Sequence, residues 1–140
     1  MAQEDKELLL KDLCARFLYG VNGLAYIVGE PCNTNTNIVG IINESIVTNY
    51  ESPILGFIDL DSKDITIKPY LRPMSSMTEE EKKEYDALYT YIKGCIDRKF
   101  KIDFSIATDW LNKHHFDFRG LIEKGLALVA PEGMYNIKEK

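Results

Sequence analysis

The C-terminal third of the chain, residues 109–135, constrains the fold more than any other segment, because nearly every residue in it has a recognisable local role. Asp117 is placed to cap a helix that follows it, and Phe116 and Leu121 flank that position as a hydrophobic staple. Gly125 stands where a helix would end in the left-handed conformation, with Leu126 placed for the contact that accompanies such an ending. The segment therefore predicts a helix through 115, a tight corner and a short helix over 118–124.

Two apolar or β-branched runs follow Gly125 and are separated by Pro131–Gly133, which predicts a closing hairpin made of Leu126–Ala130 and Met134–Ile137. This density of local signals describes a fold. It names no reaction, cofactor or ligand.

The N-terminal half predicts one helix and then a sheet. Apolar residues at helical spacing over 5–17 indicate an amphipathic helix. Residues 29–37 contain proline, three asparagines and two threonines, which is typical of a loop. Short β-branched runs predict strands over 24–28, 38–42, 45–48, 54–58 and 65–71, with Asp61–Asp64 as a hairpin tip. Gly40 and Gly56 inside apolar runs suggest bulges that curl the sheet.

A long helix is predicted after Thr78, because Thr78 and Glu81 have the spacing of a capping box. Its apolar positions recur every three or four residues and are expected to face the core; they are Tyr85, Leu88, Tyr89, Ile92, Cys95 and Ile96. Residues 100–104 are expected to form a connector or a short strand. The fold class is therefore α+β in a single domain of 140 residues: an N-terminal helix, a small curled antiparallel sheet of four or five strands, a long helix, two shorter helices and a C-terminal hairpin.

Composition limits the classes of function. The chain has 45% hydrophobic and 28% charged residues, as ordinary globular proteins do. A net charge of −5 disfavours broad phosphate binding to nucleic acid. No apolar run is long enough to span a membrane and the N-terminus lacks the core of a signal peptide, which predicts a cytoplasmic protein without membrane contact. The odd number of cysteines, at positions 14, 32 and 95, indicates reduced and mostly buried thiols.

The candidate chemical sites are weak. His114 and His115 are adjacent beside Asp117, but zinc-binding histidines on a helix are usually four residues apart, so a role at the helix end is favoured. The carboxylates of Asp59–Asp64 lack the glycine and glutamate of an EF-hand loop. Neither a nucleophile elbow nor a phosphate-binding glycine motif is present. We therefore expect no catalytic residue, metal or cofactor, although a site can also assemble without a linear motif.

An alternative comes from the order of the last elements. Residues 78–137 are similar to a winged-helix domain, in which a recognition helix leads through a turn into a β-wing and binds DNA. In that interpretation Lys113, His114, His115, Arg119 and Lys124 would face DNA. The short predicted recognition helix, its apolar residues and the acidic charge of the chain count against it.

Three segments also resemble a known group of sequences. They are Leu8–Arg16 with Tyr19–Val21, Leu71–Glu81, and Asp109–Asn112 through Gly133–Tyr135. They are similar to small uncharacterised proteins of Bacteroides genomes and of their temperate phages or mobile elements. The resemblance implies an origin and an intracellular compartment, and it implies no activity.

We therefore expect a non-enzymatic intracellular binding or regulatory module, of phage or mobile-element type, that acts through a protein partner. A winged-helix-like DNA regulator is the alternative, followed by a small-molecule pocket or an unrecognised enzyme. His115, Arg119 and Lys124 are the candidate partner contacts, because local structure does not account for these polar residues at the corner.

Overall fold

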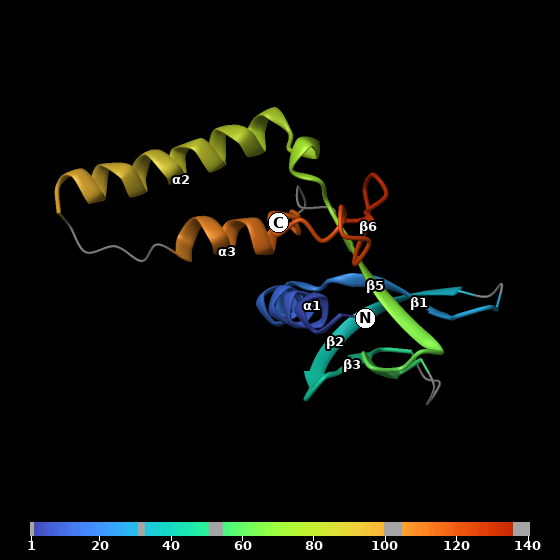
Figure 1. Cartoon of the computed structure of the whole chain (residues 1–140). Coiled ribbons are helices and arrows are strands. Elements are labelled where there is room, and N and C mark those ends of the chain that lie inside the picture. Colours follow the sequence, from blue (N-terminus) through green and yellow to red (C-terminus); the bar gives the residue numbers. More distant parts are fainter. Residues whose placement is uncertain (1, 31–32, 51–54, 100–104, 136–140) are drawn as a thin grey trace.

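The computed structural model describes residues 2–30, 33–50, 55–99 and 105–135 (Figure 1). They form an α+β fold, as the sequence predicts. In chain order the elements are α1 (Gln3–Arg16), the 3₁₀ turn η1 (Phe17–Tyr19), β1 (Asn22–Ile27), β2 (Asn33–Ile42), β3 (Ser45–Thr48), β4 (Phe57–Asp59), β5 (Ile65–Leu71), the 3₁₀ turn η2 (Met74–Ser76), α2 (Glu79–Asp97), α3 (Ser105–Lys113) and β6 (Leu128–Val129).

The sheet has six strands in the order β4-β3-β2-β1-β5-β6, where four or five were predicted. The first five are antiparallel to their neighbours, whereas β5 and β6 are parallel. Residues 60–64 join β4 at one edge to β5, which lies beside β1 on the far side. So short a connection requires a curled sheet, and β4 and β5 do contact each other. The expected turn at Asp61–Asp64 exists, but it is not a hairpin tip, because β4 pairs with β3.

The first half of strand β2 was expected to be a loop. Residues 33–37, expected as a loop, are its first half and pair with β1 from Tyr26↔Asn33 to Asn22↔Asn37. Asn33, Asn35 and Asn37 alternate on the exposed side while Thr36 is buried. The ladder uses backbone groups, so polar side chains on the solvent side are tolerated. The bulge expected at Gly40 is confirmed by a register shift between Ile38 and Gly40.

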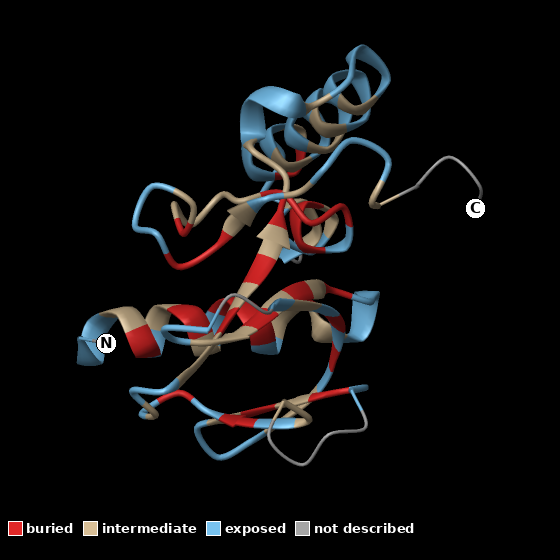
Figure 2. Ribbon diagram, turned by 90° about the vertical axis from the view of Figure 1, so that its right-hand side faces the viewer, coloured by how far each residue is buried: buried red, intermediate tan, exposed pale blue. Residues whose placement is uncertain are grey.

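Helix α1 lies between the sheet and the later helices (Figures 1 and 2). Its Leu9 and Leu13 are fully buried in the hydrophobic core. The remaining core residues come mostly from the strands and from the segment after α3; they are Val21, Ala25, Ile38, Ile46, Ile58, Leu60, Ile67, Leu71, Leu121, Leu126 and Ala127. Chain segments from both ends of the sequence therefore share one core.

A buried ionic network joins α1 to the corner that follows α3. Asp12 and Arg16 are both fully buried and pair at 2.6 Å, and Arg119 donates to the same Asp12 oxygen at 2.7 Å. Arg16 also donates to the Phe116 carbonyl at 3.0 Å. Burial lowers the pKa of Arg16, while Asp12 acts in the opposite direction. Each charge is tolerated here only because the others remain in place.

A second ionic contact holds α1 against the loops of the sheet. The Lys6 ammonium lies 2.9 Å from a carboxylate oxygen of Glu44 and 2.9 Å from one of Asp61. The hydrogen bonds that Lys6 donates to Asp61 and to Glu44 raise the pKa of Lys6, the one to Asp61 more strongly. The Asp61 carboxylate, which the sequence analysis weighed as a calcium ligand, is thus used by a lysine of α1.

Helix α2 begins with the predicted capping box, in which Thr78 accepts from the Glu81 N–H and Glu81 accepts from the Thr78 N–H. The prediction that its apolar stripe faces inward is wrong for Tyr89 and Ile96, which are exposed, whereas Tyr85, Leu88 and Ile92 are half-buried. Only Cys95 is buried among the α2 residues, and the helix projects from the body with α3 beneath it (Figures 1 and 2). The nine residues of α3 cannot cover a helix of 19 residues. We call α2 and α3 together the arm.

In the corner after α3, the predicted Asp117 cap and the predicted left-handed ending at Gly125 are both confirmed. Asp117 accepts from the N–H groups of Leu121 and Ile122 at 2.9 Å each. Gly125 is left-handed with φ +74°, its N–H bonds the Ile122 carbonyl, and the Leu126 N–H bonds the Leu121 carbonyl, as in a Schellman motif.

Two predicted elements of the same region are wrong. Residues 118–124 form turns instead of a second short helix. Leu128–Val129 pairs with Tyr70 and Leu71 of β5 in parallel instead of closing a hairpin, because the exposed edge of β5 supplies the backbone partners. Met134 and Tyr135 are not in a strand, while residues 136 and 137 lie outside the described residues. So do residues 100–104, the expected connector.

The cysteine prediction is confirmed in part, because Cys95 is a buried free thiol but Cys14 is exposed. Cys32 lies outside the described residues. None of the described helices is both long and apolar enough to cross a membrane.

The buried network makes a testable prediction. Replacing Asp12 by alanine leaves Arg16 and Arg119 without their shared carboxylate, and we expect the free energy of unfolding to fall by about 3–5 kcal/mol. Chemical denaturation followed by circular dichroism measures this. Glu4→Ala removes an exposed carboxylate from the same helix and should change stability by less than about 0.5 kcal/mol. Equal effects of the two substitutions would contradict the role of the network.

Candidate functional site

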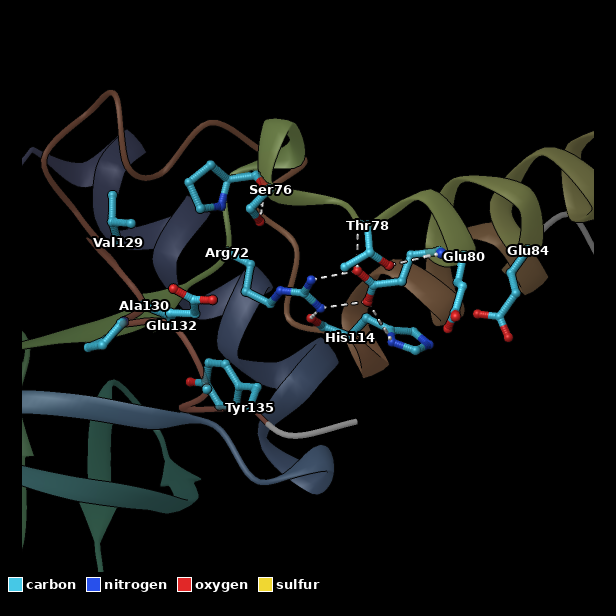
Figure 3. Close-up of a pocket in the computed structure, with 14 residues that line it drawn as sticks. Arg72, Ser76, Thr78, Glu80, Glu84, His114, Val129, Ala130, Glu132 and Tyr135 are labelled. Atoms are coloured by element: carbon cyan, nitrogen blue, oxygen red, sulfur yellow. Dashed lines mark hydrogen bonds and ion pairs between the residues drawn. The ribbon is translucent and has the colours of Figure 1, made fainter. Parts of the chain in front are cut away.

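A cavity of about 730 Å³ lies between the start of α2, the end of α3 and the segment after β6 (Figure 3). Four glutamates line it, Glu80, Glu81 and Glu84 from α2 and Glu132 from the segment after β6. Among the described residues, Arg72, which directly follows β5, is the only arginine or lysine in the lining. The remaining lining residues are Pro73, Ser76, Thr78, His114, Val129, Ala130, Pro131, Gly133 and Tyr135. The cavity is therefore acidic.

Arg72 and Glu81 form the most ordered contact of the cavity. The two guanidinium nitrogens donate to the two carboxylate oxygens at 2.7 and 2.6 Å, a bidentate arrangement. Arg72 also lies over the ring of Phe116, 4.2 Å from its centroid. Burial alone would raise the pKa of Glu81, but hydrogen bonds from Arg72 and from the Thr78 N–H outweigh it and lower the pKa to about 2. Glu81 is therefore ionised near neutral pH and neutralises Arg72.

His114 stands next to this pair. Its Nδ1 lies 3.6 Å from Glu81 Oε2, and its ring packs against Trp110 in a tilted arrangement with centroids 4.2 Å apart. Burial lowers the pKa of His114, although Glu81 and Glu84 act in the opposite direction. The imidazole is thus neutral at pH 7. Trp110 also packs against Tyr85 of α2 at a tilt and stacks on Phe116, so aromatic rings join the arm to the body.

Tyr135 forms the wall of the cavity opposite α2. Its hydroxyl donates to the Tyr70 carbonyl at 2.7 Å and accepts from the Asn22 N–H at 2.9 Å. Burial raises the pKa of Tyr135 to about 12, so the hydroxyl keeps its proton. The ring stacks on His115 with centroids 4.0 Å apart. Tyr135 therefore holds the segment after β6 against β1 and β5 and fixes this side of the cavity.

Two lining groups with acid–base or nucleophilic chemistry, Glu81 and Ser76, are both engaged in hydrogen bonds. Glu81 is held by two hydrogen bonds from Arg72, and it is too weakly basic to take a proton near pH 7. The lining contains one serine, Ser76, whose hydroxyl donates to the Pro73 carbonyl at 2.6 Å and has no base bonded to it. Among the described residues, no three histidine, cysteine or acidic side chains are grouped to hold a metal ion.

The three predicted contact residues lie elsewhere. His115 is buried, with φ +61°, and its Nε2 lies 3.1 Å from the Tyr19 carbonyl. It occupies the left-handed position that ends α3, since the His115 N–H bonds Asn112 and the next N–H bonds Leu111. Arg119 belongs to the Asp12 network, and only Lys124 is exposed. None of the three lines the cavity, and their contact with a partner stays a prediction.

The winged-helix interpretation of residues 78–137 loses its structural basis. It required a recognition helix and a β-hairpin wing, but residues 118–124 are turns and β6 pairs in parallel with β5. Arg119 and His114, which were to face DNA, are turned inward.

No pattern in the sequence predicts the cavity residues as a set. Glu81 was recognised only as a helix cap and Arg72 was not singled out. The one available signal was that Arg72 closely precedes a capping box, so the two charges are nine residues apart and both flank the start of α2. His114, Glu132 and Tyr135 join them only through tertiary packing.

Comparisons with known proteins were negative. No family model matches the chain, and neither curated proteins nor solved structures give a match.

The Glu81 contact predicts a pH dependence of stability. Its folded pKa of about 2 lies below the usual 4.5, so the ionised carboxylate stabilises the folded chain above pH 4.5, and this contribution is lost as the pH falls toward 2. Allowing for solvent screening, we expect Glu81→Gln to lower the free energy of unfolding by about 1–2 kcal/mol at pH 7. The difference in the free energy of unfolding between this variant and the unsubstituted chain should narrow at pH 3. Urea denaturation at both pH values measures this difference. Glu80→Gln, which changes an exposed carboxylate of the same helix, is the control. A difference that does not change with pH would refute the stabilising role of ionised Glu81.

Proposed function

We propose that this chain is a non-enzymatic binding module that takes a basic segment of a protein partner into the acidic cavity. The observation that carries the proposal is the uncompensated charge of the lining. Arg72 is already paired with Glu81, and among the described residues Glu80, Glu84 and Glu132 have no ion pair. A lysine or arginine side chain would supply the missing positive charge.

The shape and the remaining lining support the same class of ligand. A volume of about 730 Å³ can hold more than one long side chain. Val129, Ala130 and Pro131 offer apolar contact for the methylene stem of lysine or arginine, while the carboxylates stand ready for its charged end. The acidic chain, with a net charge of −5, would also attract a basic partner over a distance and raise the rate of association.

The partner itself is proposed from the resemblance of the sequence to uncharacterised proteins of Bacteroides genomes, phages and mobile elements. On that basis the module acts inside the cell as a regulator, and the protein that supplies the basic segment belongs to the host or to the element. An interaction through Lys124 near the corner would add to this contact without replacing it.

A peptide titration tests the proposal. We expect a fluorescent peptide of alternating lysine and glycine to bind, with an affinity that falls as salt is raised, and a glutamate peptide of equal length not to bind. Glu84→Gln combined with Glu132→Gln should weaken binding by about fivefold to tenfold, measured by fluorescence anisotropy. Glu123→Gln, an exposed carboxylate outside the cavity, is the matched control. Equal loss in both variants would refute the cavity as the binding site.

Affinity capture from the native cell identifies the partner. The unsubstituted chain should enrich at least one protein, and the double variant should lose it while Glu123→Gln keeps it. Capture that enriches no protein would contradict the proposal, and so would retention of the chain on DNA at low salt without any binding to the basic peptide.

A further inference from the structure

A second surface lies on the opposite side of α2 from Glu80 and Glu84. Lys82, Asp86, Tyr89, Lys93 and Asp97 recur every three or four residues, so they form one stripe along the helix, and all of them are exposed. Tyr89 is 63% exposed, and Ile96 beside the stripe is 52% exposed. We call these six residues the α2 stripe. Its apolar groups are left open by the projection of the arm from the body (Figures 1 and 2).

The charges along the α2 stripe follow an order that is complementary to itself when reversed. From the start of the helix to its end the stripe runs positive, negative, tyrosine, positive, negative. Read from the other end, the same stripe runs negative, positive, tyrosine, negative, positive. Two copies placed side by side in opposite directions therefore set unlike charges against each other at every charged position. Two copies in the same direction would set like charges together, which is unfavourable.

We infer that the α2 stripe is the contact between two copies of this chain, which pair antiparallel about a twofold axis beside Tyr89. Asp86 of one copy then faces Lys93 of the other, and Lys82 faces Asp97, with each pair occurring twice. The two Tyr89 rings meet near the axis, and Ile96 packs toward the first half of the other helix. Such a contact uses the same patch on both copies, as twofold interfaces do.

The contact is a small one. Helix α2 has 19 residues and is about 28 Å long, so an antiparallel pair buries the stripe and little else. Exposed ion pairs select orientation more than they add affinity, while the aromatic and aliphatic groups at the centre supply most of the attraction. We expect the weak, concentration-dependent dimer that interfaces of this size give. Because the stripe and the acidic cavity lie on opposite sides of α2, this inference is independent of the proposed function.

Sedimentation velocity of the full chain tests the inference at concentrations from about 10 μM to 1 mM, the range in which a weak dimer forms. The weight-average mass should rise toward twice that of the single chain. Asp86→Lys and Lys93→Asp should each weaken the dimer by about fivefold or more, because each places two like-charged pairs in the contact. The double variant carrying both changes should regain the affinity of the unsubstituted chain. Tyr89→Lys should give a monomer throughout.

Ala87→Lys adds the same charge to an exposed position on another side of α2 and should leave the dimer unchanged. A chain that stays monomeric over the whole range overturns the inference. A double variant that remains as weak as the single ones overturns the antiparallel register, since only that register exchanges the two charges. Circular dichroism of each variant confirms that α2 is retained.

Discussion

The structure depends on Arg72, which holds three parts of the molecule together. Its N–H donates to the His115 carbonyl and its carbonyl accepts from the Asp117 N–H, both at 2.8 Å, so the end of β5 is fixed to the corner after α3. Its side chain lies over the ring of Phe116 and forms an ion pair with Glu81 at the start of α2. The sheet, the corner and the arm meet at this residue. The acidic cavity lies at this meeting point, and both Arg72 and Glu81 line it.

The sequence predicts those features whose partners are close along the chain. Thr78 and Glu81 are three residues apart, and the Asp117 cap and the Gly125 ending lie within nine residues, so local spacing is sufficient. The antiparallel pairing from β1 to β4 is predictable for the same reason, since each of these strands pairs with the next, whereas β5 pairs with β1. The expected loop over 33–37 failed because asparagine disfavours a strand only while its backbone has no partner, and β1 supplies one.

The remaining features depend on pairs that no local pattern reveals. Arg119 contacts Asp12 across 107 residues, and Tyr135 contacts Asn22 across 113. The parallel pairing of β6 follows from where the corner places it, and the exposure of α2 follows from the shortness of α3. His115 shows the difficulty at one residue: its polarity suggested a surface contact, yet its left-handed backbone and buried ring belong to the end of a helix.

The buried network of Asp12, Arg16 and Arg119 has a consequence for synthesis of the chain. Translation releases α1 well before residues 116 and 119, which supply the carbonyl that Arg16 binds and the arginine that completes the network. Until those residues leave the ribosome, the buried Asp12–Arg16 pair of α1 lacks Arg119 and the Phe116 carbonyl, and the corner cannot close the core. Helix α1 therefore reaches its final packing only after residue 119 has been released.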